Sequence, residues 1–358
     1  MIRKQQMNLE QRIQSFSRLG EILSQFGPEH IERNTLIENP VDSFNLLNEA
    51  IQLAFIKNPW FTEPNVLYSL SQWSQLLKAD AINQWVSDYK LDEVEPKTVA
   101  IIMAGNIPLV GFHDFLSVLI TGHKALVKQS SNDTILLKAI SKILIGLEPE
   151  FQHYIVFTED RLDGFDAVIA TGSNNTARYF DYYFGKYPSL IRKNRNSIAI
   201  LHGDESEEQL EALSDDIFRY YGLGCRNVSK IYVPEDYNFD PFFKAIYKWH
   251  HIIHEHKYAN NYDYNKAVYL MSEFDMLDNG FVVLKKDEQM ASPIATINYE
   301  SYSSTDTLVK KLASLEEDIQ CIVGQGLNKG EIEFGSTQSP SLNTYADNVN
   351  TVEFLLTI

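Results

Sequence analysis

The chain has 358 residues, of which 44% are hydrophobic, and a formal net charge of −17 at pH 7. This length allows about two domains with substantial cores, and the composition is that of a globular protein and not of a disordered or repetitive one. The acidic balance argues against nucleic acid as a main partner, because phosphate binding requires a basic face.

The sequence also argues against a membrane or secreted protein. No apolar run reaches the roughly 18 residues of a membrane span, and the opening residues MIRKQQMNLEQR lack the apolar core of a secretory signal. The two cysteines, Cys225 and Cys321, are too few for a disulfide framework or a zinc site. We therefore expect a cytoplasmic protein in a reducing compartment, without a bound metal.

Residues 1–94 have a helical pattern. Apolar residues recur at every third or fourth position in 9–26, 41–58 and 80–89. From Lys97 onward, short β-rich segments alternate with helical ones. We expect a helical N-terminal region that packs on the domain after it.

The alternating region predicts a parallel sheet. The expected strands are 98–104, 124–130, 154–158, 166–173 and 197–203, and the expected helices are 112–121, 133–147, 175–187 and 206–222. Such alternation is typical of a doubly wound sheet with helices on both faces. Ligands of these sheets bind beyond the carboxyl ends of the strands.

A second α/β region follows Cys225. Its expected elements are a strand at 229–236, a helix at 240–256, strands at 266–271, 281–286 and 320–324, and a strand-like tail at 351–358. The division we predict is a helical region at 1–94, a Rossmann-like nucleotide-binding domain at 95–215, a catalytic domain carrying Cys225 at 216–335, and a C-terminal return segment at 336–358.

Cys225 lies in the stretch YYGLGCRN, directly after Gly224 and three residues after Gly222. A structural cysteine usually occupies an apolar strand or helix face, whereas a reactive one must be accessible. We interpret Cys225 as a nucleophile and Cys321, which has apolar strand neighbours, as a core residue.

Three loops after predicted strands are candidates for a phosphate-binding site: 105–108, 128–131 and 171–177. Glycine lets the backbone approach a phosphate, and a following helix supplies free N–H groups. Each loop alone is also a common strand-to-helix turn, and none has the three-glycine dinucleotide pattern. His250 and His254 lie one helical turn apart, but without a carboxylate partner we favour a solvated helix face over a metal site.

Together with Cys225, these segments resemble the aldehyde dehydrogenase superfamily. AGNIPLVG resembles its Asn-x-Pro loop, ALVKQSSND its Lys-Pro-Ser-Glu loop, VIATGSNNTA its Thr-Gly-Ser turn and YYGLGCRN its Gly-Gln-x-Cys segment. The ordered match covers about residues 97–235. The short chain and the stretch NNYDYNKAVYLM are most similar to the bacterial acyl-CoA reductases (LuxC-like).

This resemblance implies an aldehyde dehydrogenase-like α/β fold and an enzyme that reduces an acyl-CoA or acyl-carrier thioester to an aldehyde through an acyl-cysteine. It implies Cys225 as the nucleophile and Asn106 as an oxyanion donor. It implies a cofactor site lined by Lys128, Ser131, Gly172 and Ser173. We also expect a homo-oligomer.

Two departures from the superfamily pattern refine the expectation. Arg192 stands near the position of the Glu that activates water in hydrolytic aldehyde dehydrogenases, so water attack on a thioester should be slow. Ser131 replaces the Glu that binds a ribose hydroxyl, which favours NADPH over NADH, although Asp133 is close in sequence. Another aldehyde or semialdehyde dehydrogenase, or a non-catalytic scaffold with a decayed site, remains an alternative.

Overall fold

The computed structural model describes residues 7–172, 174–326 and 331–358. The chain forms two compact units. The first unit comprises Met1–Lys193 and Ser341–Ile358, and the second comprises Asn194–Pro340. Each is built around its own sheet.

The N-terminal part of the first unit is helical, as the periodicity predicts. It contains α1 (Leu9–Leu23), the 3₁₀ helix η1 (Pro40–Asp42), α2 (Ser43–Lys57), α3 (Glu63–Leu76) and α4 (Ala79–Val86). A capping box starts α1: the Asn8 side chain accepts from the Gln11 N–H at 2.8 Å, and the Gln11 side chain accepts from the Asn8 N–H at 3.0 Å.

The first sheet is parallel and has five strands. These are β1 (Thr98–Ile102), β2 (Lys124–Lys128), β3 (Ile155–Phe157), β4 (Ala167–Thr171) and β5 (Ser189–Arg192), in the order β3-β2-β1-β4-β5. The connections are α5 (Phe112–Ile120), α6 (Leu136–Leu147), η2 (Pro149–His153) and α7 (Asn174–Phe184). The strand order reverses between β1 and β4, which is where ligands bind in open α/β sheets.

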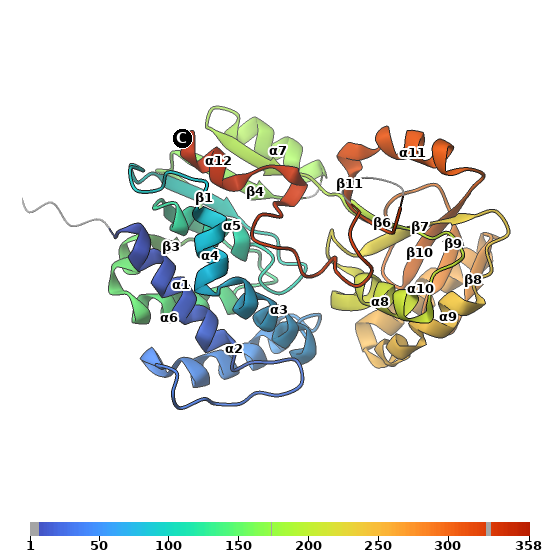
Figure 1. The fold of residues 1–358 in the computed structure, drawn as a ribbon, viewed down its shortest axis with the longest axis horizontal. Coiled ribbons are helices and arrows are strands. Elements are labelled where there is room, and N and C mark those ends of the chain that lie inside the picture. The colour runs from blue at the N-terminus through green and yellow to red at the C-terminus, as the bar shows by residue number, and fades with distance from the viewer. Residues whose placement is uncertain (1–6, 173, 327–330) are drawn as a thin grey trace, which may run out of the picture. The chain divides into compact units, whose positions relative to one another are not determined.

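The two faces of this sheet are covered differently (Figure 1). On one face, α1 to α4 share a single core with α5, α6 and the sheet, as Phe16, Leu119 and Val127 illustrate. On the other face, Phe180 and Phe184 of α7 pack near Val168. The helical N-terminal region therefore shares its hydrophobic core with the first sheet.

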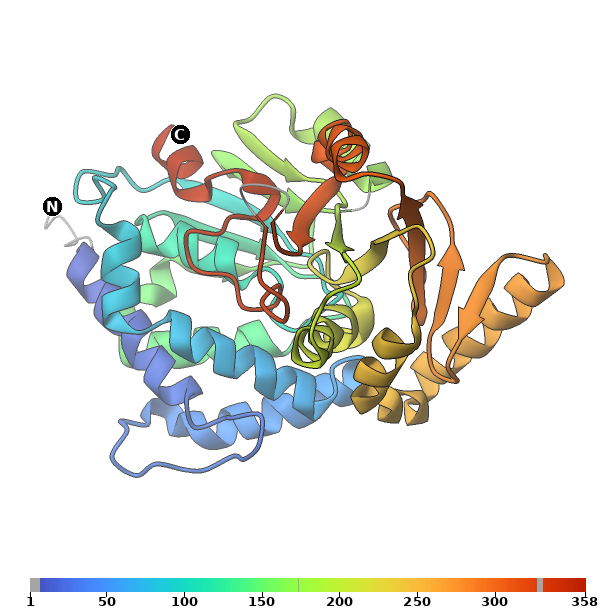
Figure 2. The same ribbon diagram turned by 45° about the vertical axis from the view of Figure 1, so that its right-hand side comes forward.

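The second unit has a six-stranded sheet. Its strands are β6 (Asn196–Ile200), β7 (Val228–Pro234), β8 (Met276–Asp278), β9 (Val283–Lys286), β10 (Thr296–Tyr302) and β11 (Ile319–Val323), in the order β11-β6-β7-β10-β9-β8. Only the pairing of the edge strand β8 is antiparallel among these. The helices are α8 (Glu207–Phe218), η3 (Arg219–Gly222), α9 (Asp240–Ile246), η4 (Tyr247–His254), α10 (His256–Met271), α11 (Thr305–Ala313) and η5 (Glu316–Asp318). In Figure 2, α11 lies on one face of this sheet and α8 to α10 lie on the other.

The boundary between the units differs from the predicted division. The prediction places residues 194–215 in the nucleotide-binding domain, but β6 pairs with β7 and β11, so this segment belongs to the second unit. The C-terminal return to the first unit begins at Ser341 and not at residue 336.

Two predicted strands are helical. Residues 266–271 form the end of α10, because its buried residues Tyr258, Tyr262, Asn265 and Tyr269 recur at helical spacing. The C-terminal tail forms α12 (Thr351–Leu356), which follows η6 (Ala346–Asn348) and packs against α5. Asn350 caps it by accepting from the Glu353 N–H at 3.1 Å.

Across the described ranges, no helix combines the length and the apolar character that crossing a bilayer requires.

Candidate active site

Two loops leave the same edge of the first sheet side by side: the Asn106 loop (residues 103–111) after β1 and the Lys128 loop (residues 128–135) after β2. Ile102 pairs with Lys128 in the ladder, and the N–H of Met103 donates to the Lys128 carbonyl at 3.0 Å. A Cβ on Gly105 would lie 2.7 Å from the Cβ of Ser130 and 3.2 Å from the backbone nitrogen of Asp133. Glycine is required there, because a side chain would push the two loops apart.

Asn106 is half-buried in a loop whose backbone is fixed at its far end. The carbonyl of Pro108 accepts from the Ser69 hydroxyl at 3.1 Å. Leu109 is buried and has a φ of 58°, a left-handed conformation that costs a residue with a Cβ about 1–2 kcal/mol. The rest of the loop must stabilise it.

Asp133 provides part of that stabilisation. Its Oδ2 accepts from the Leu109 N–H at 3.3 Å, and the residue is 9% exposed. Burial raises the pKa of Asp133 to about 6, although the N–H groups of Leu109 and Leu136 act in the opposite direction. Asp133 is close in sequence to Ser131 and the expected ribose site, but in the structure its carboxylate bonds to the Asn106 loop.

Lys128 and Ser131 lie at the carboxyl edge of the first sheet. Lys128 ends β2, and its Nζ donates to the Asp160 carbonyl at 2.9 Å. Ser131 is exposed three residues later. The loop therefore presents a half-buried ammonium group and an exposed hydroxyl.

Gly172 follows β4, on the other side of β1. A Cβ there would lie 3.0 Å from both the Cβ of Thr176 and the Cε2 of Phe180. The missing side chain lets the backbone turn closely into α7, whose first N–H groups have no partners within the helix. Ser173, the other cofactor residue predicted here, lies outside the described residues.

Cys225 belongs to the second unit, between η3 and β7, and it is exposed. Tyr220, Tyr221 and Gly222 before it have φ values of 54°, 58° and 74°. Three successive left-handed residues turn the chain sharply after α8. The accessibility that the sequence predicts for this thiol is confirmed.

Asn227 fixes this turn and is a residue that the sequence reasoning missed. It is 2% exposed; its Oδ1 accepts from the Gly224 N–H at 2.8 Å, and its Nδ2 donates to the carbonyls of Asp216 at 3.0 Å and Arg219 at 2.9 Å. The Ser197 hydroxyl donates to the Cys225 carbonyl at 2.9 Å. An amide residue two positions after the cysteine, at the start of an apolar strand, was the available signal.

Cys321 is 5% exposed in β11 and is a core residue, as predicted. The Nη1 of Arg226 lies 3.2 Å from its Sγ. Burial raises the pKa of the Cys321 thiol, although Arg226 opposes that shift. The two cysteines therefore differ in exposure, and burial disfavours the thiolate of Cys321.

Arg192 ends β5 and is 4% exposed. Its Nη2 lies 2.6 Å from Oδ1 of Asp114, and its Nη1 donates to the Ala346 carbonyl at 2.7 Å. It also donates to the Thr351 hydroxyl at 2.8 Å. Near the position of the hydrolytic Glu, the chain thus has a structural cation that fastens the C-terminal segment to the first unit.

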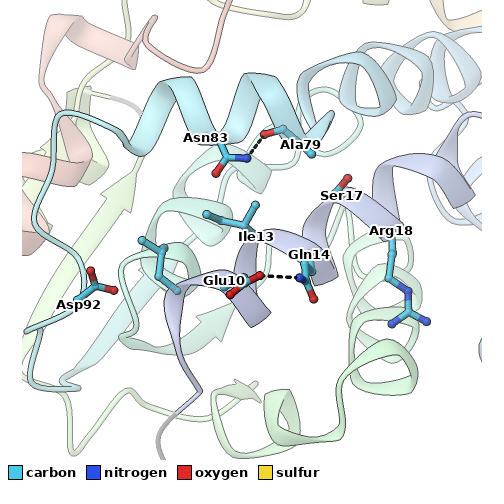
Figure 3. A pocket seen from close by; sticks show the side chains of 9 residues that line it. Glu10, Ile13, Gln14, Ser17, Arg18, Ala79, Asn83 and Asp92 are labelled. Carbon is cyan, nitrogen blue, oxygen red and sulfur yellow. Dashed lines mark hydrogen bonds between the residues drawn. The ribbon is translucent and has the colours of Figure 1, made fainter.

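Two other features of the described part of the chain add nothing to the site. No group of three or more His, Cys, Asp or Glu residues among the described ones is placed to hold a metal ion. A surface hollow of about 580 Å³ lies between α1 and α4 and is lined by residues such as Glu10, Gln14 and Asn83 (Figure 3). Because those helices carry none of the candidate residues, we assign the hollow no role.

Comparisons with known proteins point in one direction. The sequence model of the family "Acyl-CoA reductase (LuxC)" matches residues 74–246, a range that contains Asn106, Lys128, Gly172 and Cys225. The long-chain acyl-protein thioester reductase of Aliivibrio fischeri is 24% identical over 220 residues. That match covers 55% of this chain and 44% of the relative, so it spans less than half of the relative's length.

Solved structures show the same fold. Aldehyde dehydrogenase 21 of Physcomitrella patens has a TM-score of 0.64 and 12% identity, over 98% of this chain and 84% of the other. The indole-3-acetaldehyde dehydrogenase of P. syringae, solved with NAD⁺, has a TM-score of 0.63 and 13% identity, over 90% and 73%. The resemblance that the sequence motifs indicate is thereby confirmed: residues 74–246 match the acyl-CoA reductase (LuxC) family, and the chain has the fold of an aldehyde dehydrogenase.

Proposed function

We propose that this protein reduces a fatty acyl thioester to the aldehyde: acyl-S-R + NADPH + H⁺ → aldehyde + NADP⁺ + HSR. The observation that carries the proposal is Cys225, an exposed thiol whose backbone is fixed by Asn227 and Ser197. It lies inside the range that matches the acyl-CoA reductase family.

In this reaction the Cys225 thiolate attacks the thioester carbonyl, and the C–S bond to the donor breaks, releasing HSR and leaving the acyl group on Cys225. Asn106 donates a hydrogen bond to the oxyanion, and one such donor is typically worth about 3 kcal/mol. When bound, the nicotinamide supplies the hydride that releases the acyl group as aldehyde.

The residues of the first unit fit a dinucleotide cofactor. Gly172 lets the backbone turn closely into the first turn of α7, and the N-terminus of a helix is a common place to bind a phosphate. Lys128 supplies a cation at the carboxyl end of β2, which lies on the other side of β1 from β4. Ser131 adds no negative charge, and the Asp133 carboxylate bonds to the Asn106 loop, which supports a preference for the 2′-phosphate of NADPH.

The acyl-enzyme should resist water. Residues 186–203 contain no Glu or Asp, and Arg192 in that segment is ion-paired with Asp114. A general base typically contributes about 10²–10⁴-fold to a rate, so its loss favours release by reduction over hydrolysis. The second candidate function is oxidation of an aldehyde or semialdehyde, which the aldehyde dehydrogenase fold favours.

The donor and the assembly complete the proposal. The Aliivibrio fischeri relative is named for long-chain acyl-protein thioesters, so we include a carrier protein as well as CoA among the donors. Tyr179, Tyr182 and Tyr183 are exposed on one side of α7, which supports a homo-oligomer. A cytoplasmic setting would keep Cys225 reduced.

An acyl-labelling experiment tests the proposal. Labelled acyl-CoA of varied chain length, without NADPH, should leave a hydroxylamine-sensitive label that intact-protein mass spectrometry detects. NADPH should then discharge it as aldehyde. Cys225→Ala should take no label, whereas the matched control Cys321→Ala should label normally.

Each contrary result points to a different alternative. A wild-type protein that takes no label at any chain length would remove Cys225 as an acyl nucleophile. Release of the label as free fatty acid would favour a hydrolytic aldehyde dehydrogenase. A Cys225 that also fails to react with iodoacetamide would favour a non-catalytic scaffold.

A further inference from the structure

Asp133 forms hydrogen bonds to both loops of the cofactor half of the site. Its N–H donates to the Ser130 carbonyl at 3.1 Å, and its carbonyl accepts from Nε2 of Gln129 at 2.9 Å. Its side chain accepts from the Leu109 N–H at 3.3 Å. One buried residue thus connects the Lys128 loop to the Asn106 loop.

The Asn106 loop depends on this bond. Leu109 is left-handed and buried, and an unsatisfied buried N–H costs about 1–3 kcal/mol in addition to the backbone strain. The close approach at Gly105 prevents one loop from moving without the other. Asn106 is three residues before Leu109, so the conformation of Leu109 sets the direction of the Asn106 backbone.

We infer that Asp133 is a positioning residue, which holds Asn106 and the Lys128 loop in one arrangement so that the oxyanion donor and the cofactor site are set together. The inference rests on the proposed function of Asn106 and Lys128. Asp133 acts through Leu109 and Gln129 and not by touching the reacting atoms.

The surroundings of Asp133 explain why its charge matters. The residues that line the small void beside it come from β1, the Asn106 loop, the Lys128 loop and α6, and the neighbours among them are uncharged: Met103, Ala104, Leu109, Gly111, Phe112, Gln129 and Leu137. A carboxylate makes a stronger hydrogen bond than a neutral acceptor, so the ionised form holds Leu109 more firmly. Because the pKa of Asp133 is raised to about 6, its hydrogen bond with the Leu109 N–H should weaken as the pH falls through that value.

Three variants test the inference. Asp133→Ala removes the acceptor, and Asp133→Asn keeps an acceptor of similar shape without the charge. Asp166→Ala is the matched control, because Oδ2 of Asp166 accepts from the Thr98 N–H at 2.7 Å at the start of β1, away from the two loops. The measurements are hydrogen exchange in residues 103–111, the single-turnover acylation rate and the NADPH Kd.

In Asp133→Ala we expect faster exchange in residues 103–111, with acylation slowed about tenfold or more and NADPH binding weakened as well, since small misplacements of catalytic groups are costly. Asp133→Asn should recover most of both functions and lose the change in acylation rate near pH 6. Asp166→Ala should match the wild type.

Two results would overturn the inference: a folded Asp133→Ala whose acylation rate and NADPH Kd stay within twofold of wild type, or an Asp133→Asn with an unchanged pH profile. The second applies even if Asp133→Ala does not fold. A wild type without acyl label whose NADPH binding still depends on Asp133 would refute the proposed reaction and support the positioning role.

Discussion

The Asn106 loop and the segment around Cys225 (residues 220–227) both hold a strained backbone conformation, and each does so with a different kind of side chain. Both contain left-handed residues that carry side chains, Leu109 in the first and Tyr220 and Tyr221 in the second. Each is held in part by a buried polar side chain, Asp133 in the first and Asn227 in the second. Asn227 is a neutral amide with its donors and its acceptor all used, whereas Asp133 is a carboxylate with uncharged neighbours.

Because one side chain is an amide and the other a carboxylate, the two segments should respond differently to pH. A neutral amide does not titrate, so the backbone that carries the thiol should keep its shape across the whole working range. A buried carboxylate with a pKa of about 6 changes its charge in mildly acidic solution. We therefore expect the oxyanion donor, and not the position of the nucleophile, to be the pH-sensitive part of the site.

The largest expected effect comes from Asn106→Ala. Loss of one oxyanion donor typically lowers a rate by about 10²–10³-fold. Because Asn106 is a half-buried loop residue, the melting temperature should change little. Rapid-quench measurement of acylation, together with calorimetry, checks both statements. An acylation rate within a few fold of wild type would remove Asn106 from the mechanism.

Asn227→Ala, in the segment around Cys225, should lower the stability of the protein. It removes three buried hydrogen bonds and leaves an N–H and two carbonyls without that partner, so the free energy of unfolding should fall by about 2–4 kcal/mol. Urea unfolding measures the loss, and Ser197→Ala, which removes one bond to Cys225, should cost about 1 kcal/mol. Equal effects of the two variants would contradict the central role of Asn227.

The buried charge of Asp133 predicts a pH-dependent stability. Its pKa is raised in the folded state, so between about pH 4 and 6 the folded protein holds a proton that the unfolded chain releases. The contribution of Asp133 to the free energy of unfolding therefore falls as the pH rises through this window. Asp133→Asn should match the wild type near pH 4 and exceed it by about 3 kcal/mol at pH 7. Parallel stability curves for the two proteins would show that the carboxylate carries no such cost.

The hydrogen bonds of Asp133 and Asn227 also show which features of the site the sequence alone does not predict. The strands and helices expected over residues 98–158 and the exposure of Cys225 follow from local patterns, and the structure confirms both. The bonds of Asp133 to Leu109 and of Asn227 to Asp216 join residues 24 and 11 positions apart, and no local pattern encodes such pairs.

The errors in the fold have the same origin. The structure places β6 in the second sheet, beside β7 and β11, whereas the strand pattern alone does not show where the chain leaves the first sheet. The apolar tail, which the sequence predicts to be strand-like, is helical, because Asn350 caps it and it packs against α5. In both places tertiary contacts decided between structures that the local sequence allows equally well.

The smallest expected effect on stability comes from Ser131→Glu, which compares an exposed carboxylate with the buried carboxylate of Asp133. Ser131→Glu would place a negative charge on the Lys128 loop, two residues before Asp133 and open to solvent. It should repel a 2′-phosphate and accept a bond from a ribose hydroxyl, changing the NADPH-to-NADH affinity ratio by about tenfold or more in favour of NADH. Because solvent screens an exposed charge, the free energy of unfolding should change by less than about 0.5 kcal/mol at any pH, unlike the effect of Asp133.

Titration calorimetry with both cofactors measures the change in the affinity ratio, with Ser131→Gln as the uncharged control of similar size. Tighter binding of NADH by the unsubstituted protein would reverse the cofactor assignment, whereas an unchanged ratio in Ser131→Glu would place the ribose away from this loop.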